Sequence, residues 1–305
     1  MNNRILITGA LGQLGEFFIN SLTEAGNYVL ATDIKKVNNI SCDFEVYDIL
    51  DIKRGDELVK KYNINQIYNF AAILSAKGEN NPMSTWDLNN AGFMNIINIC
   101  IDNDIKRVFW PSTIAVFGKN SNLEFANNDE PMLPVTMYGV SKLACEKAMY
   151  YFNSKNIIDI RSIRFPGIVS NSKPGGGTTD YIVEMLYNAK ENQDYICFLN
   201  SDTQLPMMHI EDAVNASINL MNADKKDISL NYPYNISSFE TSPSKWNKII
   251  NSLGYNLNVK YKADYRQNIA DSWPKKIDDS ILRNDIKWEP KFNDVNTAKL
   301  IIDSI

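Results

Sequence analysis

The sequence has one histidine, His209, and four cysteines, none of which forms a CxxC pair. Zinc sites need clustered Cys, His or carboxylate ligands, so we expect no metal centre and no zinc-dependent oxidation of alcohols. The cysteines are widely separated in a chain of 305 residues, which argues against a disulfide framework. We expect reduced thiols that pack as small apolar residues: Cys42, Cys100, Cys145 and Cys197.

The chain also lacks a charge excess and a long apolar run. Its net charge is −5 and its hydrophobic content is 44%, so nucleic acid and anionic membranes are not expected partners. No apolar run approaches the ~20 residues that a membrane-spanning helix needs. The opening MNNRILITG leads straight into a strand-like run without a basic leader, and we therefore expect a cytoplasmic protein.

The first two-thirds of the sequence alternate β-branched runs with segments of helical periodicity. Strands are predicted at 4–8, 28–32, 66–70, 107–110 and 158–164, and helices at 13–25, 52–62, 83–103 and 138–154. This alternation predicts an α/β fold, with a doubly wound parallel sheet covered by helices on both faces. After residue 165 the pattern loosens, with further helices at about 211–222 and 243–253. We expect a nucleotide-binding domain at 1–165, to which some later segments return, and a smaller α/β substrate lobe at 166–305.

A glycine-rich turn follows the first predicted strand and precedes a helix. Gly9, Gly12 and Gly15 would allow a tight turn, close approach of the backbone to a pyrophosphate, and close packing of helix on strand. Asp33 ends the second strand 18 residues after Gly15, where a carboxylate binds the adenosine ribose in Rossmann-type folds. Asp33 favours NAD over NADP. Lys35 and Lys36 could accommodate a 2′-phosphate, although a solvated loop is the simpler interpretation of this pair.

Tyr138 and Lys142 form the second informative pattern. Positions i and i+4 lie on one face of a helix, so the lysine would lie one turn from the phenol. A free tyrosine has a pKa near 10 and is a weak base at neutral pH. The lysine ammonium and a positively charged nicotinamide ring would together lower that pKa. Ser112 and Thr113 follow the strand at 107–110, and their hydroxyls would point into the crevice beyond the strand ends. Capping of a turn is the alternative role for these hydroxyls.

These motifs together resemble the extended short-chain dehydrogenase/reductase superfamily over nearly the whole chain. Within it, the sequence is similar to the short-chain L-threonine 3-dehydrogenases through AAILSAKGE (71–79), WPSTIAVFG (110–118), RFPGI (164–168), PGGGTTDY (174–181), LPMM (205–208) and ADSWP (270–274). The resemblance implies threonine catabolism: NAD-dependent oxidation of the C3 hydroxyl of L-threonine, giving 2-amino-3-oxobutanoate and NADH.

The resemblance also implies roles for individual residues. Tyr138 would be the general base, Lys142 would hold the nicotinamide ribose and lower the tyrosine pKa, and Thr113 would bind the reacting hydroxyl. The cofactor would contact Gly9, Leu11, Gly12, Gln13, Leu14, Gly15, Asp33, Ile34, Lys35, Asp48, Ile49, Ala71, Ala72, Asn89, Tyr138, Lys142 and Ile168. Substrate would contact Thr113, Tyr138 and, with turn formation or packing as the alternative, Ser75, Ser112, Thr178, Thr179 and Trp273.

Of these, Asn89 would position the lysine or a relay water, and Ile168 would offer its backbone to the nicotinamide carboxamide. Asp48 would reach the adenine edge or cap a turn. The glycines at 175–177 would let their loop close over the substrate. The helices at 83–103 and 138–154 would pair two subunits into a homodimer.

Some features depart from the resemblance or leave it open. His209 and Phe165 stand where relatives often carry tyrosine, and we expect His209 to pack in an apolar run rather than to act as the base. A nucleotide-sugar 4-epimerase or dehydratase shares the fold, the cofactor and the Tyr/Lys pair, and a non-catalytic NAD sensor is a further alternative. The lobe of ~140 residues favours a small amino acid as substrate.

Overall fold

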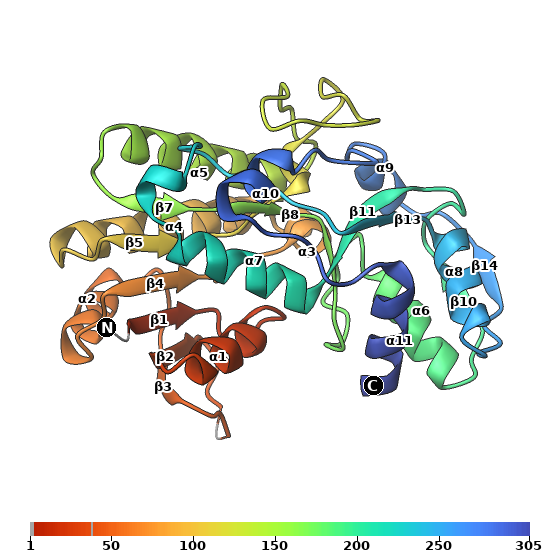
Figure 1. Ribbon diagram of the computed structural model, residues 1–305, viewed down its shortest axis with the longest axis horizontal. Helices are drawn as coiled ribbons and strands as arrows, with labels where there is room; N and C mark the ends of the chain where they lie inside the picture. The colour runs from red at the N-terminus through yellow and green to blue at the C-terminus, as the bar shows by residue number, and fades with distance from the viewer. Residues whose placement is uncertain (1–2, 38) are drawn as a thin grey trace.

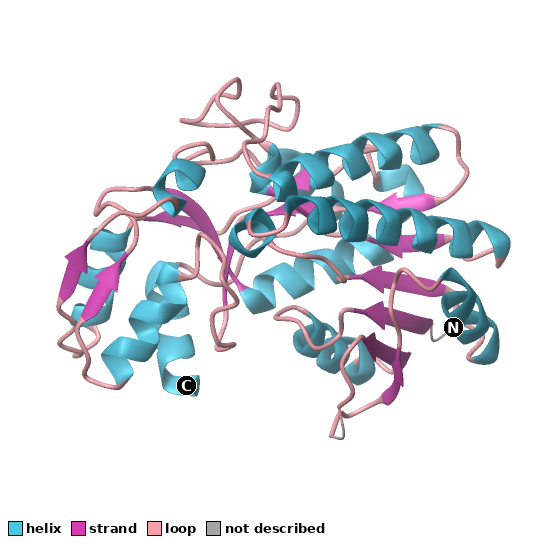
Figure 2. Ribbon diagram, turned by 180° about the vertical axis from the view of Figure 1, so that it is seen from behind, coloured by secondary structure: helices cyan, strands magenta, loops and turns pink. Residues whose placement is uncertain are grey.

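The computed structural model describes residues 3–37 and 39–305. The larger part of the molecule is a parallel sheet with helices on both faces, and a smaller part containing α6, α8 and α11 lies beside it (Figure 1). Seen from behind, the strands of the larger part run side by side between the two helical layers (Figure 2). The predicted α/β fold with a parallel central sheet is therefore confirmed.

The central sheet has six parallel strands in the order β3-β2-β1-β4-β5-β7. They are β1 (Arg4–Thr8), β2 (Tyr28–Asp33), β3 (Asp43–Val46), β4 (Gln66–Asn69), β5 (Arg107–Phe109) and β7 (Asp159–Arg161). The chain runs outward from β1 to β3 and then returns to place β4 on the other side of β1. Because the direction of winding reverses at β1, a crevice opens beyond the carboxyl ends of β1 and β4, where such sheets bind ligands.

Side chains of β1 explain why both faces of the sheet are covered. Ile5 and Ile7 join one apolar cluster and Leu6 joins another, because successive residues of a strand point to opposite faces. The first cluster lies under α1 (Gly15–Glu24) and α7 (Ile210–Asn222), and the second under α2 (Ile52–Lys61), α4 (Pro82–Asp102) and α5 (Met137–Ser154). An apolar run without polar alternation is the pattern of a strand buried on both faces.

The prediction of a single strand over 158–164 is wrong. β7 ends at Arg161 in the central sheet, whereas β8 (Ile163–Phe165) pairs with β6 (Ser112–Thr113) and β12 (Tyr234–Asn235) in a separate small sheet. The chain thus changes sheets at Ser162. Periodicity within a short apolar run cannot reveal a change of pairing partner, because both sheets bury the segment.

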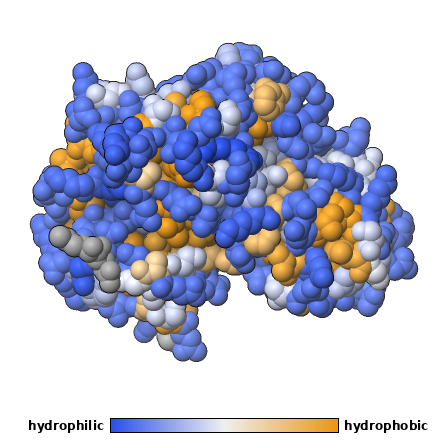
Figure 3. Space-filling model, in the orientation of Figure 1, coloured by the Kyte–Doolittle hydropathy of each residue, from blue (hydrophilic) through white to orange (hydrophobic). Residues whose placement is uncertain are grey.

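The smaller part has its own apolar core. Its helices are α6 (Tyr181–Lys190), α8 (Pro243–Ser252) and α11 (Asp294–Ser304), and its strands are β9 (Gly167–Val169), β10 (Tyr195–Cys197), β11 (Leu205–His209), β13 (Phe239–Thr241) and β14 (Val259–Tyr261). Trp246 is fully buried between α8 and α6, and its indole N–H donates to the carbonyl of Ile182 at 2.9 Å. The face of the molecule seen in Figure 1 is mostly polar in the space-filling view, and its largest apolar area lies over the region of α11 and α8 (Figure 3).

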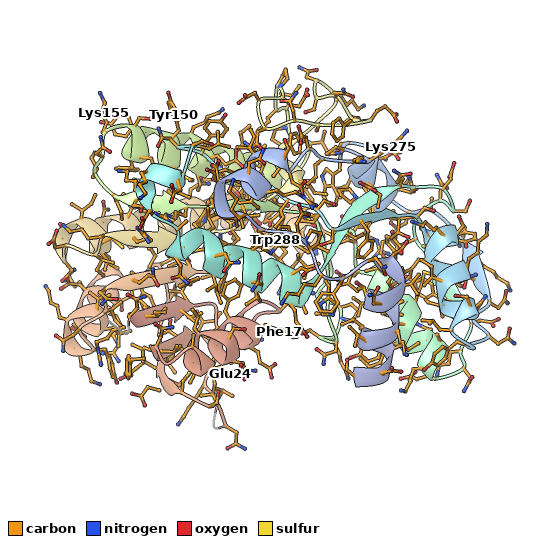
Figure 4. The ribbon with its side chains drawn as sticks, viewed as in Figure 1. Phe17, Glu24, Tyr150, Lys155, Lys275 and Trp288 are labelled. Carbon is orange, nitrogen blue, oxygen red and sulfur yellow. The ribbon has the colours of Figure 1, made fainter. Side chains whose placement is uncertain are left out.

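Late segments of the chain return to the larger part. After α10 (Ser280–Ile286), Trp288 packs against the α1–α7 side of the sheet and donates its indole N–H to Asn215 of α7 at 3.1 Å. Figure 4 shows Trp288 beside α7. α7 and α10 are thus two of the later segments that pack on the larger part. No helix in residues 3–37 and 39–305 is both long and apolar enough to cross a membrane.

Candidate active site

The turn after β1 leaves no room for side chains. Gly9 has a φ of +64°, and a Cβ there would lie 2.7 Å from the backbone nitrogen of Ala71. A Cβ on Gly15 would lie 2.1 Å from the carbonyl oxygen of Ala10, so this glycine lets α1 begin directly against the turn. Gly15 itself does not line the cleft. Gly9 and Gly12, which carry no side chains, line the cleft, where the N-terminus of a helix favours an anion such as a pyrophosphate.

One end of the cleft is a cavity of about 360 Å³ beside Asp33. The Asp33 carboxylate, at the end of β2, accepts hydrogen bonds from the backbone N–H groups of Leu11 and Lys35, each at 3.1 Å. Asp48 lines the same cavity while its carboxylate accepts from the N–H of Leu50 at 2.9 Å, so both roles considered for it fit its position. Ten residues predicted to contact the cofactor meet here: Gly9, Leu11, Gly12, Asp33, Ile34, Lys35, Asp48, Ile49, Ala71 and Ala72.

The other end is a cavity of about 160 Å³ at the start of α5. Thr136 caps this helix by accepting from the N–H of Gly139 at 3.1 Å, which places Tyr138 in the first turn. Thr113 lies beside Tyr138, where its side chain lowers the pKa of the phenol, and Lys142 Nζ lies 5.8 Å from the centroid of the Tyr138 ring. Tertiary structure thus brings together the three residues predicted to be catalytic. Ala72, Leu74 and Phe70 line both cavities, which are therefore parts of one cleft.

The environment of Lys142 explains its orientation. Its ammonium donates to the carbonyl of Pro111 at 2.7 Å and lies 4.4 Å from the centroid of the Trp110 ring. Burial lowers the pKa of Lys142 to about 8, although Cys145 and Glu146 oppose this effect. Trp110 and Glu146 were not among the predicted site residues. Glu146 could have been predicted, because a residue four positions after Lys142 lies on the same helix face.

The pKa of Tyr138 differs from the sequence-based expectation. Burial raises this pKa to about 12, and the hydrogen bond with Thr113 is the opposing effect. Lys142 does not lower this pKa in the protein without a nucleotide, because its own pKa of about 8 leaves it uncharged at the pH where the phenol ionises. The chain's own groups therefore leave Tyr138 protonated at neutral pH. A further positive charge in the cleft is needed to make it a base.

Two other predicted polar residues bond away from the cleft. The Ser112 hydroxyl donates to Glu146 at 2.5 Å, although Ser112 also lines the small cavity. Asn89 lines neither cavity. Its amide donates to the Ser141 hydroxyl at 3.0 Å and also pairs with both backbone groups of Ile73. Asn89 thus contacts the residue before Lys142 rather than the lysine itself.

The remaining predicted residues line the small cavity: Gln13, Leu14, Ser75, Ile168, Thr178, Thr179 and Trp273. The Gln13 amide donates to the carbonyl of Ile168 at 3.3 Å and to the Ser170 hydroxyl at 2.9 Å, which ties the glycine turn to β9. The buried hydroxyl of Thr178 finds no hydrogen-bond partner among the described residues. Buried polar groups are seldom unpaired, so this hydroxyl is available to a ligand.

The loop before α6 crosses the cleft. Gly175 lines the cavity beside Asp33 and Gly177 lines the small cavity. The N–H groups of Gly176 and Gly177 both donate to the carboxylate of Asp180 at 2.8 Å, and Gly176 has a φ of +93°. The loop therefore has the position that a lid over the cleft requires.

His209 lies outside both cavities. Its imidazole Nδ1 accepts from the N–H of Glu211 at 3.2 Å at the start of α7, and its ring lies 4.2 Å from that of Phe292. Burial lowers the pKa of His209 to about 4, so the imidazole is neutral at pH 7. Its position is that of a packed helix cap. Among the described residues, no group of three His, Cys, Asp or Glu side chains could hold a metal ion.

Known proteins resemble this chain over its whole length. An uncharacterized epimerase/dehydratase of Staphylococcus saprophyticus is 38% identical, with 99% of this chain and 97% of the relative covered. A structure titled monomeric L-threonine 3-dehydrogenase, from a metagenome database, is 40% identical over 98% of both chains, with a TM-score of 0.95. The holo form of a GalE-like L-threonine dehydrogenase from Cupriavidus necator is 34% identical over 99% of both chains, also with a TM-score of 0.95.

The sequence profile of one family matches residues 5–237, which include the glycine turn, Asp33, Thr113, Tyr138 and Lys142. That family is defined by dependence on a nicotinamide nucleotide, and the cleft described above has the glycine turn and the helix N-terminus that such a nucleotide requires. A small-molecule substrate is consistent with the cavity beside Tyr138. The chain is an enzyme that belongs to the NAD-dependent epimerase/dehydratase family.

Proposed function

We propose that this enzyme oxidises the C3 hydroxyl of L-threonine with NAD, giving 2-amino-3-oxobutanoate and NADH. The observation that carries the proposal is the meeting of Thr113, Tyr138 and Lys142 in one cavity of about 160 Å³. A hydroxyl, a phenol and an ammonium in one cavity are the groups that acid–base oxidation of an alcohol requires. The structural neighbours titled as threonine dehydrogenases support the same substrate.

Residues of the chain fit the proposed cofactor. Gly9 and Gly12 line the cavity without side chains, and a Cβ at Gly9 would collide with the backbone of Ala71, so the turn keeps the bare surface that a pyrophosphate needs. The Asp33 carboxylate, fixed by two backbone N–H groups, would accept from the adenosine ribose hydroxyls and repel a 2′-phosphate. We therefore propose NAD rather than NADP. Lys142 would hold the nicotinamide ribose.

The chemistry assigned to the chain is acid–base catalysis. NAD, when bound, supplies the hydride acceptor and a positively charged ring. Thr113 holds the substrate hydroxyl beside Tyr138, and Tyr138 takes the proton from that hydroxyl as the hydride leaves C3. Thr178 and Thr179, with Ser75, offer hydroxyls to the substrate's carboxylate and ammonium, and Trp273 closes the wall of the cavity.

The test is the appearance of NADH absorbance when L-threonine is added to the purified protein with NAD. We expect turnover with threonine, none with UDP-glucose, and a preference for NAD over NADP. Tyr138→Phe should lose at least about 100-fold in kcat, which is the usual contribution of a positioned general base. Tyr150→Phe is the matched control, because Tyr150 is an exposed phenol on the same helix. Equal rates in the parent and Tyr138→Phe would refute the proposal.

We also propose that two copies pair through α4 and α5. Trp86 of α4 and Val140 and Tyr151 of α5 are exposed apolar or aromatic side chains on these two helices, which pack against each other. Sedimentation equilibrium should give twice the chain mass, and Trp86→Glu should give the chain mass. A parent that sediments as a monomer at micromolar concentration, like the neighbour titled monomeric, would contradict this pairing.

A further inference from the structure

A buried ion pair lies behind the candidate active site. Arg164 of β8 donates to Glu146 of α5 through two bonds, Nε to Oε1 at 3.0 Å and Nη2 to Oε2 at 2.9 Å, and each side chain is 2% exposed. Arg164 also donates to the carbonyl of Asn128 and to the side chain of Asn235. Burying two charges has a desolvation cost that apolar side chains of equal volume avoid. Stability alone therefore does not explain why the pair is there.

Contacts of the pair lead to the catalytic residues. The Ser112 hydroxyl donates to Glu146, and Ser112 is the register partner of Arg164 between β6 and β8. One turn earlier on α5, Lys142 donates to the carbonyl of Pro111. Two residues of α5 thus hold two consecutive residues of the segment that ends in Thr113. This double attachment sets the position of Thr113 relative to Tyr138, which is on the same helix as Glu146.

The carboxylate of Glu146 also lies one helical turn from the ammonium-bearing Lys142 on α5. Cys145 and Glu146 are the titratable groups that favour the charged form of Lys142. The segment before β6 presents the indole of Trp110 and a carbonyl to Lys142, neither of which titrates. From α4, Asn89 and Asn90 contact Ser141 and Cys145, and these amides do not titrate either. Arg164 is the charged group that faces Glu146, and the ring of Tyr138 is the titratable group nearest to Lys142 from the first turn of α5.

We propose that Glu146, held by Arg164, is a positioning residue that aligns Thr113 with Tyr138 and keeps the ammonium of Lys142 charged. Neither member of the pair lines the cleft, so neither touches substrate or cofactor. The proposal deepens the proposed function and rests on it. It predicts that kcat falls even in a variant that lacks both charges and therefore buries no unpaired ion.

Two variants separate alignment from charge. Glu146→Asp keeps the charge but shortens the side chain, so it should lower kcat for threonine about 10- to 100-fold through misalignment, with the pH profile unmoved. The double variant Glu146→Gln/Arg164→Gln removes both charges and leaves no unpaired ion. It should show the same fall in kcat and, in addition, an alkaline limb of the kcat/KM profile that lies at lower pH.

A direct readout of Lys142 does not require turnover. In protein labelled with ¹³C at lysine Cε, the Lys142 resonance, assigned with Lys142→Met, should titrate near 8 in the parent. It should titrate at lower pH in the double variant and at the parental pH in Glu146→Asp. This titration still tests the inference if the parent fails to oxidise threonine, which would refute the proposed function alone.

Asp159→Asn is the matched control. Asp159 pairs with Arg161 and Arg107 at the end of the sheet and lines neither cavity of the cleft. This variant should lower the unfolding temperature and leave kcat and the Lys142 resonance unchanged. A double variant with parental kcat and an unmoved Lys142 titration would overturn the proposal. If the double variant does not fold, parental kcat in Glu146→Asp overturns it equally.

Discussion

The hydroxyl of Thr113 is the group of this chain that opposes the high pKa of Tyr138. Thr113 accepts from the N–H of Ala115 at 3.2 Å, so its single proton is free to be donated to the phenol oxygen. A donor stabilises the phenolate more than the phenol. Replacing Thr113 by valine keeps the shape and removes the donor. We therefore expect Thr113→Val to raise the pKa of Tyr138 above its present value of about 12.

The size of this effect follows from the strength of the bond. A hydrogen bond to a charged group contributes about 1.5–3 kcal/mol, and one pKa unit corresponds to ~1.36 kcal/mol. The pKa of Tyr138 should therefore rise by about 1–2 units. In the proposed mechanism the deprotonated phenol is the active form, so kcat/KM on the acidic limb should fall about 10- to 100-fold at a given pH. The ascending limb should move to higher pH by the same 1–2 units.

The assay is the initial rate of NADH formation from L-threonine across the pH range, under conditions that give kcat/KM. Thr113→Ser, which keeps the donor, is the control and should stay close to the parental profile. Valine also loses the hydrogen bond from the N–H of Ala115, which caps the short helix at 114–116. The thermal unfolding temperature of each variant therefore shows whether a fall in rate comes from lost stability. A Thr113→Val profile that coincides with the parent would refute the reasoning.

Three further predictions concern cofactor choice, stability and the lid. Asp33→Ser should raise kcat/KM with NADP relative to NAD at least about 10-fold, because the repulsion of a 2′-phosphate is lost; an unchanged ratio would contradict this. His209 has a pKa of about 4 in the folded protein, so the unfolded chain binds more protons below its own pKa of about 6.5. Stability should therefore fall by about 2 kcal/mol from pH 7 to 5 through this group, and urea unfolding of His209→Gln should show a shallower fall. Gly176→Ala, at a φ of +93°, should change both kcat and KM for threonine, and unchanged constants would exclude the lid.

Local spacing was enough to predict much of the fold and the site. The spacing of Gly9, Gly12 and Gly15 between a strand and a helix predicts a tight turn, because a glycine such as Gly9 adopts a positive φ without a steric penalty. Tyr138 and Lys142 share a helix face because positions i and i+4 always do. Alternation of apolar strands and periodic helices predicts a parallel sheet, since both faces of each strand must be covered.

Tertiary structure decided what depends on burial and on distant partners. Glu146 and Arg164 are 18 residues apart and pair because β8 leaves the central sheet and lies beside β6. The Ser112 hydroxyl donates to Glu146 of this pair, although the sequence predicted a contact between Ser112 and the substrate. The pKa of Tyr138 rises to about 12 because packing removes water from the phenol. Burial of a side chain depends on the whole fold, so the five residues from Tyr138 to Lys142 cannot predict the loss of water around the phenol.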